Sequence, residues 1–181
     1  MNAGGSAGTG PSGAAGTGTS GNAGAGPVGG AGAPADTGAT SLSGTLGDLG
    51  AVEPTVSSFV ISNSGETLVY LTSAPITCDT LTTSRWLGSI DANAQVVEIV
   101  VKSSFTTGTA TVGGSPSVEV NYAKGGRSSA YEQNAASGTV TFTTNTPKGP
   151  VAGTVDAKYA NPTGNVSGQF SAEFCDGGQG Y

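Results

Sequence analysis

Histidine is absent from this chain of 181 residues. Without an imidazole, Ser-His-Asp and Cys-His catalysis, histidine-ligated metals and the usual general base near neutral pH are excluded. Carboxylate-pair chemistry, Ser-Lys dyads and calcium bound by oxygen ligands survive this test. The sequence contains no motif for them, so we expect no catalytic residue, no metal and no cofactor, and a protein that is not an enzyme.

Charge is also scarce, with six Lys and Arg residues against twelve Asp and Glu. So few cations cannot neutralise a run of phosphates, which excludes nucleic acid as a partner, and the acidic balance argues against anionic membrane surfaces. No apolar run approaches the roughly 18–20 residues that span a bilayer. Residues 1–4 lack the basic and apolar regions of a signal peptide. We interpret the chain as a mature exported protein whose leader was replaced by the initiator Met.

The first forty residues contain almost nothing that can be buried. They are Gly, Ala, Ser, Thr and Pro, with Asp36 as the one ionisable side chain and Met1 and Val28 as the larger apolar ones. Ordering each residue costs roughly 1–2 kcal/mol of backbone entropy, which only apolar burial could offset. We therefore predict a disordered tether over residues 1–41 and a single domain over residues 42–181.

From Leu42 onward, short apolar alternations are separated by turn residues. The strand-like segments are residues 53–62, 67–71, 95–102, 117–122, 139–143, 151–159 and 166–174. Seven or more strands at this spacing predict an all-β fold, an antiparallel β-sandwich or alternatively a small β-barrel. The alternation directs Glu98, Glu119, Asp156 and Glu173 to an outer sheet face. Asp79 to Leu87 predicts one short helical turn with Leu81 and Trp86 as its apolar contacts.

Cys78 and Cys175 are the only cysteines. Two thiols without histidine do not make a usual structural zinc site, and a catalytic cysteine would lack its imidazole partner. In an exported chain the simple interpretation is a disulfide between them. It would connect the last predicted strand to the body of the domain.

Two segments are candidates for binding. Gly125, Gly126 and Arg127 lie in a basic, glycine-rich loop that could offer backbone N–H groups and a guanidinium to a small anion or carboxylate, although a plain hairpin loop explains it too. Arg85 and Trp86 would form a contact hot spot if exposed, although the sequence favours a Trp86 that covers the core near the disulfide.

The spacer, the segment 73–78 that ends in Cys78, and the closing sequence Val-Ser-Gly-Gln-Phe-Ser-Ala-Glu-Phe-Cys at 166–175 together resemble Gram-negative bacterial surface or outer-membrane lipoproteins of unassigned function. In that class a lipidated cysteine precedes a Gly/Ala/Ser/Thr spacer and a β-domain. The resemblance implies an outer-membrane or cell-surface location and carries over no catalytic residue. Met1 stands where the lipidated cysteine would be, so this chain could meet a membrane only through an N-terminal lipid that it lacks.

The sequence therefore favours a non-catalytic binding or structural module outside the cytoplasm, secreted or displayed at the cell surface by a flexible tether. Its expected partner is a protein or a glycan. One alternative is a self-assembling filament subunit, a homo-oligomer that uses the N-terminal segment or a sheet edge. A second alternative is a glycan hydrolase that uses paired carboxylates.

Overall fold

The structure is a computed structural model of the chain, and it describes Met1 and residues 39–53, 55–63, 65–82, 93–102, 105–124 and 133–176. The chain divides into two units, Met1–Pro34 and Ala35–Tyr181. All helices and strands described belong to the second unit. The predicted tether lies outside the described residues except for its two ends, Met1 and residues 39–41.

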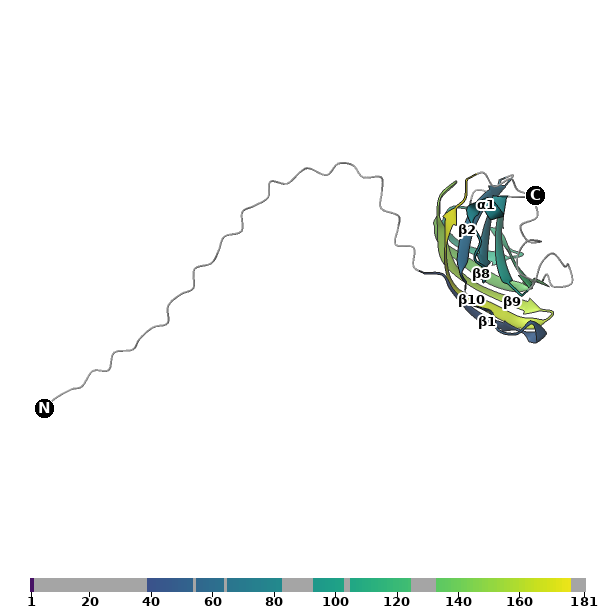
Figure 1. The fold of residues 1–181 in the computed structure, drawn as a ribbon, viewed down its shortest axis with the longest axis horizontal. Coiled ribbons are helices and arrows are strands. Elements are labelled where there is room, and N and C mark those ends of the chain that lie inside the picture. Colours follow the sequence, from purple (N-terminus) through teal and green to yellow (C-terminus); the bar gives the residue numbers. More distant parts are fainter. Residues whose placement is uncertain are drawn as a thin grey trace. The chain divides into compact units, whose positions relative to one another are not determined.

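The second unit is built almost entirely of strands, which confirms the predicted all-β class (Figure 1). The elements are β1 (Ser41–Leu46), the 3-10 turn η1 (Gly47–Leu49), β2 (Ser57–Asn63), β3 (Glu66–Thr72), α1 (Cys78–Thr82), β4 (Gln95–Lys102), β5 (Gly108–Val112), β6 (Ser117–Lys124), β7 (Gln133–Asn134), β8 (Ser137–Asn145), β9 (Val151–Ala160) and β10 (Thr163–Phe174). Three strands, β1, β5 and β7, have no counterpart among the predicted segments, because Gly44 interrupts the apolar pattern of β1 and the other two are short. The strand expected from Glu53 starts instead at Ser57, since the Glu53 N–H is bonded to the Gln95 side chain.

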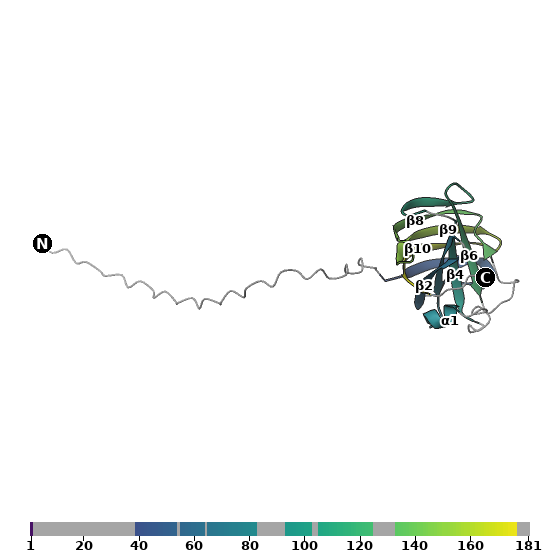
Figure 2. The same cartoon turned by 90° about the horizontal axis from the view of Figure 1, so that it is seen from above.

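The strands form one sheet in the order β1-β10-β2-β3-β4-β6-β5-β8-β9, and β9 also pairs with β10. The path of pairings that leaves β10 at β2 therefore returns to β10 at β9. Figure 2 shows β8, β9 and β10 running across the direction of β2, β4 and β6. The choice between sandwich and barrel stays a prediction.

Most pairs are antiparallel, as expected, with two short parallel exceptions. Strand β10 meets β2 through Glu173 and Phe174, and β5 meets β6 through Thr111 and Val112. The second exception arises because the connection at 113–116 loops through a full turn, closed by a hydrogen bond from the Thr111 N–H to the Pro116 carbonyl. The β10–β2 pair connects the strands that run with β8, β9 and β10 to those that run with β2, β4 and β6, and the β5–β6 pair does the same (Figure 2).

The main hydrophobic core lies on the inner face of the sheet. Period-two alternation buries Val118, Val120 and Tyr122 of β6, and the same pattern holds in the other strands predicted to alternate. The further core residues from β8, β9 and β10 are Val140, Phe142, Val151, Val155, Ala157, Tyr159, Val166, Phe170 and Ala172. Phe142 packs edge-to-face against Phe170 with ring centroids 5.9 Å apart. These predicted core faces are confirmed.

Inward-facing glycines let strands pass close to one another between these large side chains. Gly168 has φ +148° and lies opposite Leu42 of β1. A Cβ atom at Gly168 would overlap the backbone carbonyl oxygen of Ser41, and one at Gly153 would overlap that of Thr141. Glycine at such positions permits the close backbone approach and bending that a curved sheet requires.

A second, smaller core covers the outer face of β2, β3 and β4. Leu68 and Tyr70 of β3 point into it, while Val69 and Leu71 point into the main core, as expected from a segment apolar on both faces. Its cover is α1, whose Leu81 is 2% exposed. The predicted helical turn is confirmed for Leu81, and Trp86 lies outside the described residues.

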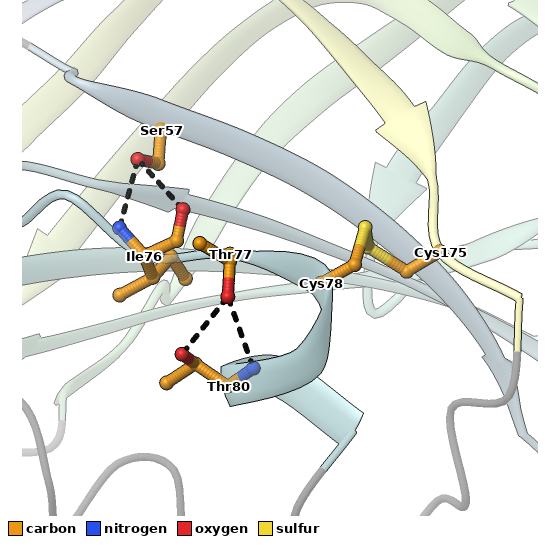
Figure 3. The surroundings of a disulfide bond; sticks show 6 residues. All are labelled: Ser57, Ile76, Thr77, Cys78, Thr80 and Cys175. Carbon is orange, nitrogen blue, oxygen red and sulfur yellow. Dashed lines mark hydrogen bonds between the residues drawn. A yellow bond between two sulfur atoms is a disulfide. The ribbon is translucent and has the colours of Figure 1, made fainter.

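The Cys78–Cys175 disulfide, with a Cα–Cα distance of 5.3 Å, holds this cover in place and confirms the predicted pairing. Figure 3 shows it joining the start of α1 to the residue after β10. Beside it, the Ser57 hydroxyl accepts a hydrogen bond from the Ile76 N–H at 3.1 Å and lies 3.4 Å from the Ile76 carbonyl oxygen (Figure 3). The Thr77 hydroxyl accepts the Thr80 N–H at 3.3 Å, which caps the first turn of α1.

Strands β1 and β2 pair with the same edge of β10, and the side chain of Thr40 fills the gap between them along that edge. Its hydroxyl donates to the Ser171 carbonyl at 2.9 Å and accepts the Ser171 N–H at 3.0 Å. It also accepts the Ser58 hydroxyl at 2.9 Å. One threonine hydroxyl therefore does for Ser171 what a paired backbone residue does elsewhere in the ladder.

We expect Thr40→Val to destabilise the domain by about 1–3 kcal/mol, because it leaves both backbone groups of Ser171 without their partner. Thr40→Ser keeps the hydroxyl and should cost much less. Urea unfolding followed by circular dichroism measures both. A Thr40→Val variant as stable as the parent, with a loss confined to Thr40→Ser, would show that the methyl group matters and the hydroxyl does not.

The disulfide closes a long loop, with a sequence separation of 97 residues. We expect its loss in Cys78→Ser/Cys175→Ser to lower the unfolding free energy by about 2–4 kcal/mol. Calorimetry of this variant beside the oxidised parent tests it. An unchanged melting temperature would contradict the expectation.

Candidate binding face

The outward side chains of β5, β8, β9, β10 and β1 line up in two rows across the strands. Pairing register places five residues in each row. The neutral row is Thr109, Thr141, Thr154, Gln169 and Ser41, and the aspartate row is Thr111, Thr139, Asp156, Ser167 and Ser43. We call the two rows together the polar face.

All ten side chains are exposed or half-buried, because strand alternation turns them away from the main core. Neighbouring strands lie about 4.8 Å apart, so the four steps of a row extend over roughly 19 Å. Four side chains within the face are already bonded, among them Ser43, whose hydroxyl donates to the Ser167 carbonyl at 3.4 Å. The Thr109 and Thr141 hydroxyls lie 2.9 Å apart, and the Gln169 amide donates to the Ala39 carbonyl at 3.2 Å.

A shallow, open hollow of about 530 Å³ lies over the middle of the polar face. Six of the ten side chains line the hollow: Ser41, Ser43, Thr139, Thr154, Asp156 and Gln169. The backbone at Gly168 and Val155 completes its lining. The inward glycines and the outward hydroxyls alternate along the same strands. The inward glycines permit the sheet to bend over its core, and the residues that alternate with them along the strand form the polar face.

The chemistry of the polar face is that of small, uncharged hydrogen-bonding groups. Asp156 is its one ionisable residue, and neither row contains an aromatic or aliphatic side chain. A hydroxyl both donates and accepts, so a row of them can satisfy a ligand that also presents hydroxyls in either sense. Asp156, Glu119 and Glu173 are exposed as predicted, and Glu98 is half-buried, its carboxylate accepting the Asn121 amide at 3.0 Å.

The two binding segments expected from sequence lie outside the described residues. Arg85 and Trp86 fall in the gap at 83–92, and Gly125, Gly126 and Arg127 fall in the gap at 125–132. Both stay predictions. The polar face was not among the candidates, although its signal is present as serine and threonine at every outward position of β1 and β5. What the sequence alone lacks is the register that aligns these residues into rows.

The described residues hold no group of three or more His, Cys, Asp or Glu side chains that could bind a metal ion. Among these same residues, no helix is long and apolar enough to cross a membrane. Comparison of the chain with protein-family models, curated proteins and solved structures finds no match.

Two buried tyrosines, Tyr122 and Tyr159, are 1% and 3% exposed, and among the described residues their hydroxyls have no hydrogen-bond partner. Burial raises the pKa of Tyr122 to about 12, and the Glu53 carboxylate adds to the rise. Burial, and then the neighbouring Tyr122, raise the pKa of Tyr159 further. Both phenols therefore resist ionisation in the folded state.

Because the pKa of these tyrosines is higher folded than unfolded, ionisation favours the unfolded chain. Below pH 10, the ordinary pKa of tyrosine, the two neutral phenols make their full contribution to the unfolding free energy. This contribution is lost as the pH rises toward and beyond about 12. We expect the unfolding free energy to fall over that window, and to fall less steeply in Tyr122→Phe/Tyr159→Phe. Denaturant titrations at pH 9, 10 and 11 measure the slopes, and identical slopes in both proteins would refute the assignment.

Proposed function

We propose that this protein is a non-catalytic, extracytoplasmic carbohydrate-binding module, displayed at the cell surface by its glycine-rich N-terminal segment. The observation that carries the proposal is the polar face, with its ten small polar side chains in two rows. Hydroxyl groups at strand spacing match the hydroxyls of a glycan, which also donate and accept.

Of the two partner classes expected, a glycan has more support than a protein. Protein interfaces depend on buried aromatic or arginine anchors surrounded by a polar rim. Neither row of the polar face contains such an anchor. A contact made here would be formed by hydrogen bonds through exposed hydroxyls.

The extracytoplasmic location is supported by the disulfide. Both cysteines of the chain are paired, and such bonds persist in oxidising compartments and are rare in the cytoplasm. The resemblance to surface lipoproteins agrees with this location.

The alternatives have less support from the described residues. Strand addition needs an open edge, and among the described strands the path of pairings that returns to β10 leaves β1 and the two-residue β7 as the strands with an edge to offer. Hydrolysis of a glycan needs two carboxyl groups about 5–9.5 Å apart, and Asp156 is the one carboxylate of the polar face. A binding role needs neither an open sheet edge nor a second carboxylate on the polar face.

Affinity electrophoresis through gels containing neutral and acidic polysaccharides tests the proposal. We expect the wild-type protein to be retarded by at least one glycan. Thr139→Val/Thr154→Val removes two hydroxyls at the hollow and keeps strand-forming side chains, so affinity should fall about tenfold if each lost hydrogen bond contributes about 0.5–1.5 kcal/mol.

Thr106→Val is the matched control, since Thr106 is an exposed threonine outside the polar face. It should bind as the wild-type protein does. Retardation by no glycan, or equal retardation of the double variant and the wild type, would defeat the proposal.

A further inference from the structure

The polar face contains one row of uncharged hydrogen-bonding groups across its five strands, while the central strand β9 also carries charge. Along β9, the outward residues are Ala152, Thr154, Asp156 and Lys158, which pass from methyl to hydroxyl to carboxylate to ammonium within one strand. Across the strands, the neutral row presents hydroxyl or amide groups at all five positions. Serine or threonine also repeats along β1 and β5, but the neutral row is the run that offers a hydroxyl or amide on all five strands to a ligand that repeats the same group along its length.

The charges around the neutral row also bear on the ligand. Asp156 lies at the centre of the adjacent aspartate row, next to Thr154 along β9. Its carboxylate can accept hydroxyl donors from a sugar but would repel a polymer carrying carboxylates or sulfates. Neither row contains a cation, and the next outward residue of β9 after Asp156 is Lys158.

Some groups of the neutral row are already held in place by hydrogen bonds. Gln169 uses its amide N–H on the Ala39 carbonyl, which leaves its side-chain oxygen to accept. The Thr109 and Thr141 hydroxyls lie within hydrogen-bond distance of each other at the opposite end, which orients that pair. Groups already held in this way lose less freedom on binding.

We infer that the ligand is a linear, uncharged polysaccharide that lies across β5, β8, β9, β10 and β1 along the neutral row. This inference rests on the proposed function and names the ligand class and its direction. The row extends over roughly 19 Å, so several sugar units contact it at once. Affinity therefore rises with oligosaccharide length until the row is filled.

Isothermal titration calorimetry with cello-oligosaccharides and laminari-oligosaccharides, from disaccharide to octasaccharide, tests the inference. In at least one series we expect the octasaccharide to bind about tenfold or more tighter than the disaccharide. Oligogalacturonides of the same length, which are anionic, should bind more weakly than that neutral series.

Variants at the ends of the row separate direction from general stickiness. Thr109→Val and Ser41→Ala, at opposite ends, should weaken the octasaccharide several-fold and leave the disaccharide unchanged. Thr154→Val, at the centre, should weaken both. Circular dichroism confirms that each variant is folded before it is titrated.

Length-independent affinity, equal effects of the end variants on short and long ligands, or tighter binding of oligogalacturonides would overturn this inference and leave carbohydrate binding itself standing. Absence of binding to every saccharide, neutral and anionic, would remove the proposed function together with it.

Discussion

Strand β10 is the constraint on which the rest of the domain depends, because it is paired along both edges. Ten of its residues pair with β9, while β1 and β2 share its other edge. At Ser171, on the edge that β1 and β2 share, neither of these two strands supplies a backbone partner, and the Thr40 hydroxyl takes that place. Without this strand, the two directions of the sheet would be joined only through β5 and β6.

The two hydrophobic cores are stabilised in different ways. The main core is continuous along the inner face and is formed by regular alternation. The second core depends on a five-residue helix and a covalent bond, since so short a helix has little stability of its own. The disulfide therefore acts where apolar contacts are fewest.

Much of this architecture follows from local sequence. Val118, Val120 and Tyr122 alternate with polar residues, so their strand and its buried face could be predicted, and two cysteines allow one pairing. Strand β1 could not be predicted because Gly44 interrupts its apolar pattern, and β5 could not because Ala110 and Val112 are its two apolar residues; both strands depend on non-local partners. The rows of the polar face depend on register across five strands, which sequence alone does not fix.

The position of β1 has a mechanical consequence. The chain that precedes Ala39 enters the domain at Ser41, beside the hollow, and a pull on that chain acts first on β1. All six register pairs between β1 and β10 would share such a load when it is applied along the strand, and Thr40 would pass part of it to β2. Because these pairs lie side by side along the strand, they would resist such a load together and not one after another.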